Sequence, residues 1–447
     1  MVNPGYSFEK QFYETREELP GKGLDWVNSY RLSGIETFSA TGFPNPSWEY
    51  WKYTKLPRIE SDSFRRMKDS DANKKVDTKA SLLPAAHLVS SLVFVNGFFR
   101  EDLSTLDKLP AEVIIETMAE GFNNQPEILR EYLSDVPDKK KSPLVALNAA
   151  FMETGVVVRV RSGARISLPI EIIYINGLTE SPVIRHPRNL IILEEGAQVS
   201  LIKQHLGLPA GEYFTNGVTD ITLGKGAELF YYAIQRENRD SVHLSTTNVC
   251  LNSEASFESF SLAIGGRISR SETNVKLNGS GSNCNVSGSF LMRGREHCDF
   301  TTVIEHVAPD TKSRQVFKGI LDDDSRGVFQ GRVIVHKDAQ KTDGHQLCKT
   351  LLLSNNSEMD AKPELEIYAD DVKCSHGATT GQIDETSLFY MRSRGIPEAL
   401  ARNLLIQSFI GEGLEEISET GVKEAVMDHV LHWLPAHCYL SQEWRTE

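Results

Sequence analysis

The sequence lacks the features that mark export, membrane insertion and disulfide scaffolds. No apolar run approaches the roughly 20 residues that a membrane-spanning helix needs. The charged and aromatic start MVNPGYSFEKQFYETREELPGKG has no basic segment followed by an apolar one, as a secretory signal would. Six cysteines in 447 residues, none in a C-x-x-C pair, do not make a disulfide framework. We therefore expect a cytoplasmic protein with reduced thiols.

Basic clusters and the common enzyme motifs are also missing. Lys and Arg number 48 against 61 Asp and Glu, a net charge of -13, and no long basic block occurs, so nucleic acid is not an expected partner. The chain contains no G-x-x-x-x-G-K-[ST], no H-E-x-x-H, no G-x-S-x-G and no G-x-G-x-x-G after an expected strand. We therefore expect that the chain binds no nucleotide by itself.

What the sequence does contain is a loose repeat that begins near residue 155. Segments of the form apolar-x-x-Gly-Ala recur as VRSGARISL, LEEGAQVSL and LGKGAELFY, and then in weaker form as LNSEASFES and LNGSGSNCN. Their leading apolar residues recur every 26 to 33 positions, and after a gap of two periods the series continues: Val160, Leu193, Leu223, Leu251, Leu277, Val335 and Ile367. Alternating residues and glycine turns at this period predict a mainly β protein with a β-helix, or β-solenoid, of about 230 residues. An antiparallel β-sandwich is the alternative.

Changes in composition divide the rest of the chain. We expect 1–80 to form an N-terminal helical domain ending in the charged linker KDSDANKKVDTKA (68–80), and 81–154 to form a mixed strand and helix segment. The β-core then spans 155–392, and 393–447 form a helical C-terminal domain with two amphipathic segments. These segments either cap the solenoid or dock a partner, for which the candidate residues are Pro397, Leu400, Leu404, Leu405, Val426 and Val430.

One short stretch, VKCSH, places a thiol and an imidazole two residues apart. If the stretch is extended, Cys374 and His376 point to the same face. With His345 and Cys348 from HQLC they offer four zinc or iron ligands, in two pairs separated by 25 residues. A Cys374 nucleophile activated by His376 is a second interpretation, and burial in a β-core is a third. The local sequence leaves all three open.

The residues around this stretch resemble one protein family. The run FQGRVIVHKDAQKTDGHQLCKTLLLSNNSEMDAKPELEIYADDVKCSHGATTGQIDETSLFYMRSRGIPEALARNLLIQSFIGE (329–412) is similar to the C-terminal core of the SufB/SufD family of iron–sulfur cluster assembly proteins. LNAAFMETGVVVRVRSGARISLPIEI (147–172) and GFPNPSWEYWKYTKL (42–56) are similar to the family as well. The resemblance therefore spans most of the chain.

The resemblance implies a right-handed parallel β-helix flanked by N-terminal and C-terminal helical domains. It also implies a non-catalytic scaffold of the SUF system, in a cytoplasmic complex of SufB, SufD and the ATPase SufC. In such a complex SufC hydrolyses ATP and binds the C-terminal helices. Whether the chain assembles with SufB as SufBC2D, as a homodimer in SufC2D2, or in both stays open.

Within the family the chain is most similar to SufD. SufB has a cysteine in a segment like LFYCR, where this chain reads LFYMR with Met391, and a thioether is a poor acceptor for sulfide and iron. The segment CSHG is similar to the SufD pattern. This implies that His376 serves the nascent iron–sulfur cluster, as a metal ligand or proton-transfer group, at an interface with SufB. Cys374 matches the accompanying cysteine, with burial in the strand as its alternative role.

Two other functions are compatible with the sequence. A solenoid also suits a stand-alone β-helix enzyme that acts on polysaccharide. Asp370 and Asp371 are the carboxylate pair available to it, although adjacent strand residues face opposite ways. A structural protein stabilised by zinc would use the cysteines and histidines named above. We expect the scaffold function, which follows from the resemblance and from Met391.

Overall fold

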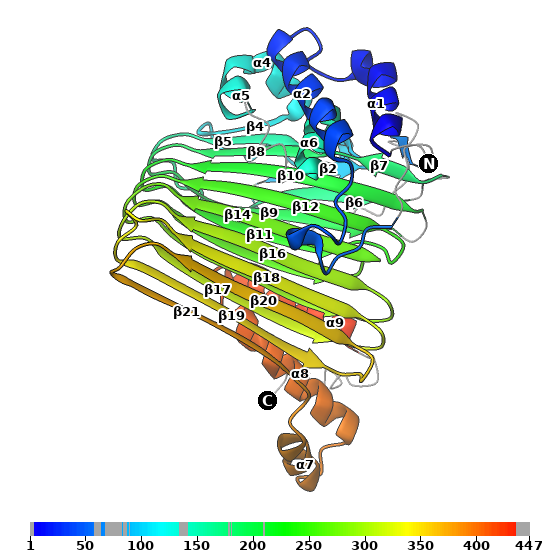
Figure 1. Cartoon of the computed structure of the whole chain (residues 1–447), viewed down its shortest axis with the longest axis vertical. Helices are drawn as coiled ribbons and strands as arrows, with labels where there is room; N and C mark the ends of the chain where they lie inside the picture. The colour runs from blue at the N-terminus through cyan, green and yellow to red at the C-terminus, as the bar shows by residue number, and fades with distance from the viewer. Residues whose placement is uncertain are drawn as a thin grey trace.

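The computed structural model describes residues 4–57, 64–67, 83, 87–88, 90–133, 142–177, 179, 181–208 and 211–434. Its body is a parallel β-solenoid of two sheets, with helices packed on the outside (Figure 1). The expected linker at 68–80 and the residues after 434 lie outside the described residues. None of the described helices is long and apolar enough to cross a membrane.

The strands alternate between the two sheets, so that each coil gives one strand to each sheet. The first sheet has the order β20 (Glu358–Ile367), β18 (Arg326–Val335), β16 (His297–His306), β14 (Ile268–Leu277), β12 (Val242–Leu251), β10 (Tyr213–Leu223), β8 (Arg188–Leu193), β5 (Val156–Val160) and β4 (Val113–Thr117), with β1 (Arg65–Arg66) and β7 (Val183–Arg185) beside this path. The second has the order β21 (Val372–Gly381), β19 (Thr342–Leu352), β17 (Lys312–Leu321), β15 (Asn283–Met292), β13 (Ser256–Ile264), β11 (Glu228–Arg236), β9 (Gln198–Gly207), β6 (Ile170–Asn176), β2 (Ser90–Val95) and β3 (Phe98–Phe99).

The strand register confirms the predicted repeat. Every leading apolar residue occupies one column of paired positions, in the order Val160, Leu193, Leu223, Leu251, Leu277, His306, Val335 and Ile367. His306 occupies this column in the one coil where the apolar pattern is interrupted. Its ring is buried, and its two nitrogens form hydrogen bonds with the hydroxyls of Thr311 and Ser313 at 2.7 and 2.8 Å. The β-sandwich alternative is wrong, because the strands of successive coils pair in parallel.

In successive coils up to Lys341, one turn contains a residue with positive φ, and several of these residues donate a backbone hydrogen bond to the same turn of the next coil. Gly196 and Gly226 have φ of 67° and 63°, a conformation that glycine adopts without steric penalty. The N–H of Gly226 donates to the carbonyl of Ser253, and the N–H of Glu254 donates to that of Ser280. Glu254 keeps the left-handed conformation at φ 62°. The repeat therefore continues structurally where its glycine is lost.

The N-terminal helices pack on the outer face of the first sheet at its early strands (Figure 1). They are α1 (Pro4–Thr15), α2 (Asp25–Thr41), α4 (Met118–Asn124), α5 (Pro126–Leu133) and α6 (Pro143–Phe151), with short 3-10 helices at Arg16–Glu18, Glu49–Trp51 and Glu101–Leu103. Gly34 lets α2 approach α6, since a Cβ there would lie 2.6 Å from the carbonyl oxygen of Ala146. Phe38 of α2 shares a buried cluster with Phe214 of β10. Residues 4–41 and 143–151 thus share one core.

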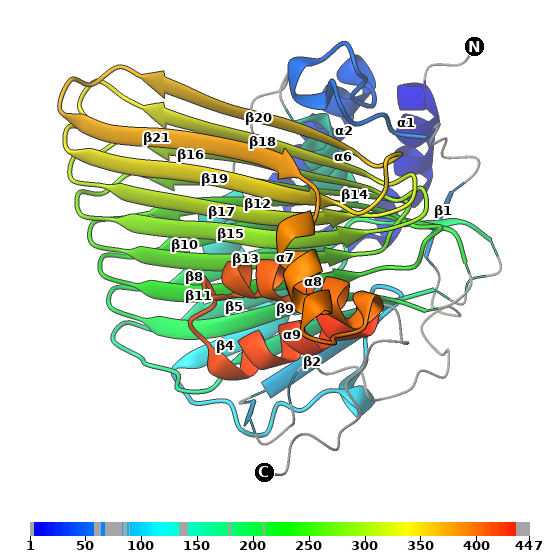
Figure 2. The ribbon, with the colours of Figure 1, turned by 90° about the horizontal axis from the view of Figure 1, so that it is seen from below.

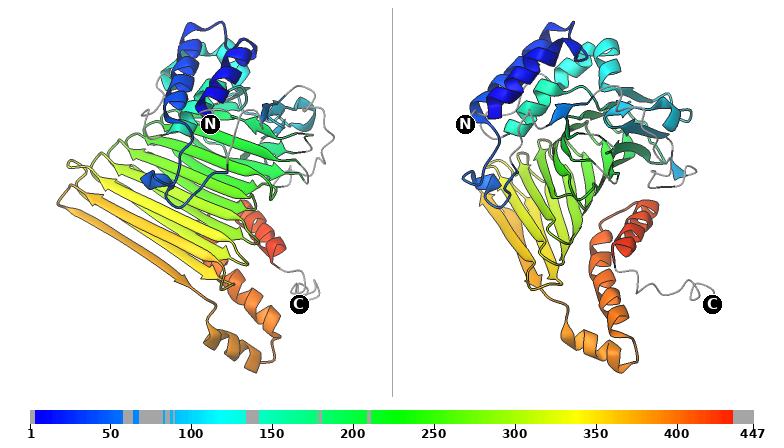
Figure 3. Two further views of the ribbon diagram at one scale, coloured as in Figure 1. Left: turned by 45° about the vertical axis from the view of Figure 1, so that its right-hand side comes forward. Right: turned by 90° about the vertical axis from the view of Figure 1, so that its right-hand side faces the viewer.

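Of the three C-terminal helices, the last two pack on the outer face of the second sheet, whereas the first contacts only the middle helix among the helices and strands it neighbours most. In chain order they are α7 (Glu385–Ser393), α8 (Glu398–Leu414) and α9 (Thr420–Trp433). Ile410 and Val430 pack with Leu262 and Ile320 of the sheet in one buried cluster. Figures 2 and 3 show α8 and α9 alongside the solenoid, while β20 and β21 remain uncovered. Of the two alternatives, capping the end of the solenoid does not match this placement, and docking of a partner stays a prediction.

The strands end earlier than the expected boundary at 392. The last strand stops at Gly381, and Asp384 then begins a helix as its N-cap, because its carboxylate accepts hydrogen bonds from the N–H groups of Thr386 and Ser387 at 3.0 and 3.2 Å. Met391, assigned from the sequence to the β-core, lies on α7.

Candidate functional site at the open end of the solenoid

The solenoid ends in two edge strands, β20 and β21. In the part of the chain that the structure describes, each pairs on one side only, which leaves its outer backbone groups without a strand partner. An exposed edge of this kind is a template for pairing with another chain. β20 reads EMDAKPELEI, and its charges and Pro363 resist such pairing. β21 reads VKCSHGATTG, with one charged residue and small side chains, and is the better template.

Cys374 and His376 lie on the same side of β21, as the alternation predicts. Gln346, the register partner of His376 on β19, is buried in the solenoid interior. On the opposite side, the ring Nδ1 of His345 lies 2.7 Å from the hydroxyl of Ser375. His376 is therefore on the interior side of β21, but it is exposed because no further coil covers it. Cys374 is half-buried against the interior core.

The environment of Cys374 keeps its thiol protonated. Burial raises the pKa of Cys374, a hydrogen bond with the backbone of Gly344 acts to lower it, and the charge of Asp343 raises it further, so that the net shift is upward. A thiol of this kind is a weak nucleophile at neutral pH, because the thiolate is the reactive form. In this chain alone the geometry does not activate Cys374.

The structure does not bring His345, Cys348, Cys374 and His376 together as the four-ligand set that the sequence left open. Cys348 is 1% exposed in the interior, where burial raises its pKa to about 12. His345 points outward, with its Nε2 2.7 Å from the Oδ1 of Asp343. Residues at i and i+3 of a strand face opposite sides, so this pair was unable to converge on one ion.

The acidic pair proposed for a polysaccharide enzyme lies in a solvent-exposed turn. Asp370 and Asp371 are both exposed just before β21, and the N–H of Asp371 donates to the side chain of Gln340 at 3.0 Å. Their place is the solvated turn that adjacent carboxylates commonly occupy, and the structure gives them no shared catalytic geometry.

The candidate partner-binding residues fall into two groups. Pro397 is exposed, and Leu400, Leu404 and Leu405 are partly exposed on α8. Val426 and Val430 are fully buried between α9 and the second sheet, where they hold the helix to its own chain.

Sequence reasoning missed two exposed aromatic residues on α7. Phe389 and Tyr390 are 71% and 60% exposed, next to the partly exposed Met391. Large exposed apolar side chains that lie together commonly mark a protein contact. The signal was present in the sequence as LFYM, but helical periodicity alone does not say which side of a short helix is uncovered.

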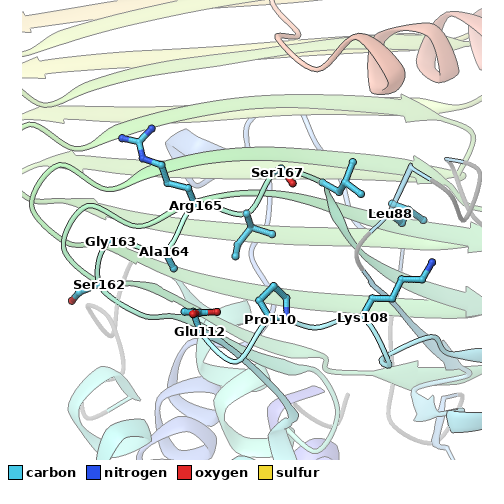
Figure 4. Close-up of a pocket in the computed structure, with 11 residues that line it drawn as sticks. Leu88, Lys108, Pro110, Glu112, Ser162, Gly163, Ala164, Arg165 and Ser167 are labelled. Atoms are coloured by element: carbon cyan, nitrogen blue, oxygen red, sulfur yellow. The ribbon is translucent and has the colours of Figure 1, made fainter.

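A separate concave surface lies in the first coil, between β5 and β6. It has a volume of about 610 Å³ and is lined by Lys108, Glu112, Arg165 and Leu168, among others. Figure 4 shows the side chains of Lys108 and Arg165 pointing in different directions rather than toward a common point. We assign no chemistry to this surface.

The fold and the site define a class of protein: a β-solenoid whose last strand, among the described residues, is an unpaired edge with an exposed histidine on it. Residues 175–409 match the SUF system FeS cluster assembly, SufBD core domain, and residues 4–172 match the SufBD protein N-terminal region. The chain belongs to the SufBD family, which gives it a role in iron–sulfur cluster assembly.

Individual relatives agree with this assignment. The chain is 31% identical over 404 residues to the iron-sulfur cluster assembly protein SufD of Escherichia coli strain K12, covering 90% of this chain and 92% of that protein. It is 30% identical over 423 residues to an iron-sulfur cluster assembly SufBD family protein of a Synechocystis strain, covering 92% of each. SufD of Bacillus subtilis is 23% identical over 94% of this chain and 95% of that protein. The predicted similarity to SufD is confirmed.

Proposed function

We propose that the chain is a non-catalytic scaffold subunit that pairs with SufB at the open end of its solenoid and assembles a nascent iron–sulfur cluster there. The observation that carries the proposal is His376, exposed on the interior side of an unpaired edge strand. A second chain seated on this edge would enclose the imidazole and supply the remaining ligands. Imidazole is a common ligand for iron.

The edge also explains why a partner would bind with its own strand. Pairing along β21 would satisfy its free backbone groups. A following coil would also cover the apolar residues that the last coil leaves partly exposed, such as Val372, Cys374 and Leu365. Cys374 would lie beside the cluster, and iron would have to displace the thiol proton for it to serve as a ligand.

We further propose that the ATPase SufC docks on α7 and α8. The supporting observations are the exposed side chains of Phe389, Tyr390 and Pro397 and the partly exposed Leu400 and Leu404, all in the segment that follows β21 along the chain. ATP would be hydrolysed by SufC, while this chain transmits the change through α8. Lys318 of β17 anchors α8 to the sheet, because its ammonium group pairs with Glu412 and donates to the carbonyl of Phe409 at 2.8 Å.

The test compares His376→Ala with the matched control His345→Ala, since His345 lies on the neighbouring strand but on the opposite face. Each chain is co-expressed anaerobically with SufB and SufC, and iron and acid-labile sulfide are measured at matched complex assembly. We expect His376→Ala to lose both, and His345→Ala to load like the native chain. Equal loading of all three complexes would contradict the role of His376 and leave this subunit a structural partner.

A further inference from the structure

The interior of the solenoid is polar at one end of its early coils. The large apolar cluster fills the side near the glycine turns, with Leu201, Tyr231 and Val249 on β9, β11 and β12. At the other end of these strands, and also on the interior side, lie Lys203 and His205 of β9 and His243 of β12. This polar region is far from β21 along the stack of coils and takes no part in the proposed function.

Three of its residues converge on one point. The Oε1 of Glu237 lies 3.3 Å from the Nδ1 of His243 and 3.8 Å from the Nδ1 of His205, and the potential ligand atoms all lie within 4.8 Å of one another. Nitrogen and oxygen ligands bonded at about 2.1 Å to one metal ion lie roughly 3–3.5 Å apart. Among the described residues, this is the one group of three or more His, Cys, Asp or Glu side chains with such convergence.

An unused ring nitrogen points to a missing ligand. His205 is 4% exposed, and its buried Nδ1 has no hydrogen-bond partner. Buried polar atoms are normally satisfied, so an unpaired one needs an explanation.

Surrounding residues hold these three side chains in place. The ring of Tyr174 stacks on that of His205 with centroids 4.9 Å apart and an angle of 13°. The carboxylate of Glu237 accepts hydrogen bonds from the hydroxyl of Tyr213 and from the amide of Asn176, the latter at 3.0 Å. Outer contacts of this kind orient the ligands of protein metal sites.

Two cationic side chains near this cluster affect which ions it can bind. The Lys203 ammonium group lies 3.2 Å from the hydroxyl of Thr219, and the Arg185 guanidinium lies over the ring of Tyr213. Their charges oppose a bare divalent cation but favour one that carries an anion. A cavity of about 30 Å³ lined by Lys203, His205 and His243 has room for one ligand the size of water.

We propose that His205, Glu237 and His243 bind one divalent first-row transition-metal ion inside the solenoid, with a small anion as its fourth ligand. Two imidazoles and one carboxylate with an open position suit ferrous iron and zinc. The proposal does not rest on the proposed function, because it uses neither the β21 edge nor a partner chain.

The test is an anaerobic titration of the metal-free full-length chain with Co²⁺, followed by absorption spectroscopy. All proteins carry His376→Ala and Cys374→Ser, so that the edge strand contributes no signal. We expect one Co²⁺ per chain with the intense visible bands of low coordination, lost in His205→Gln and in His243→Gln. His186→Gln is the matched control, since His186 is equally buried and also has an unpartnered ring nitrogen, yet lies outside the cluster. It should bind Co²⁺ like its parent.

Competition separates the candidate ions. Displacement of Co²⁺ by Fe²⁺ or by Zn²⁺ supports the site, and the ion that displaces it at lower concentration is the preferred one; displacement by neither overturns the proposal. Retention of the same bands in both histidine variants also overturns it. If those variants do not fold, the parent chain decides: Zn²⁺ should raise its unfolding temperature and a chelator should reverse the rise, and no rise overturns the proposal.

Discussion

At the scale of single residues, the turn positions show how one substitution hides a repeat without breaking it. Gly226 and Glu254 occupy equivalent places in successive coils with nearly equal φ, 63° and 62°. A non-glycine residue in this conformation carries backbone strain of order 1 kcal/mol. The strain at Glu254 is tolerated because hydrogen bonds from the neighbouring coil fix the turn.

The first prediction is that Gly226→Ala lowers the free energy of unfolding by about 1 kcal/mol, and that Glu254→Gly raises it by a similar amount. The reason is conformational alone at position 226, because a Cβ there would meet no atom within 4 Å. Urea unfolding followed by circular dichroism measures both. Lys225→Ala, in the same exposed turn, is the control and should change little. An unchanged midpoint for Gly226→Ala would show that the turn is not strained.

At the scale of elements, α8 has one surface that is buried against its own chain and another that is partly exposed. Ile410 is fully buried against the second sheet, whereas Leu400 and Leu404 are partly exposed and do not belong to that cluster. Truncating a fully buried Ile commonly costs about 2–5 kcal/mol. A surface that binds a partner should instead tolerate truncation in the isolated chain.

The second prediction follows from this difference. Leu400→Ala with Leu404→Ala should reduce co-purification of SufC while leaving the unfolding temperature of the isolated chain nearly unchanged. Ile410→Ala should lower that temperature. Affinity capture on tagged SufC and differential scanning calorimetry measure the two effects. Undiminished capture of SufC by the double variant would place the docking surface elsewhere.

The same elements show what a sequence can and cannot predict. The column of residues from Val160 to Ile367 could be predicted because strand alternation and coil length are local properties of the sequence. His306 was missed as a member of this column because it is polar, whereas the search pattern was apolar. The same alternation predicted the shared face of Cys374 and His376. Val426 was chosen as a contact residue because amphipathicity reveals an apolar face but not what covers it. His205, Glu237 and His243 formed no motif, since only the winding of the coils brings them together.

At the scale of the whole molecule, stability depends on histidines kept neutral in the interior. Burial lowers the pKa of His186 to about 3 and that of His306 to about 4, from an ordinary value of 6.5. Burial and the charge of Arg236 lower the pKa of His429 to about 4, against a raising effect of Asp428. Protonation therefore favours the unfolded chain, in which these residues titrate at higher pH.

The third prediction is that stability is greatest above pH 6.5 and falls progressively as the pH drops from 6.5 toward 4. The sign follows because a lowered folded-state pKa means that the unfolded state takes up the proton first. Unfolding temperatures measured across this range should decline less steeply for His306→Gln than for the native chain. His336→Gln, at an exposed position, is the control and should follow the native curve. Parallel curves for all three would contradict the prediction.

The common register of the coils also has an evolutionary consequence. Because Leu251 and Leu277 occupy equivalent places, loss of residues 252–277 would remove one whole coil and bring His306 into register with Leu251. Every remaining side chain would still face the side it faces now. A deletion of half that length would remove one strand of a coil, so that each downstream strand would have to join the opposite sheet. Length variation among relatives should therefore be inherited in whole coils, or else confined to the turns.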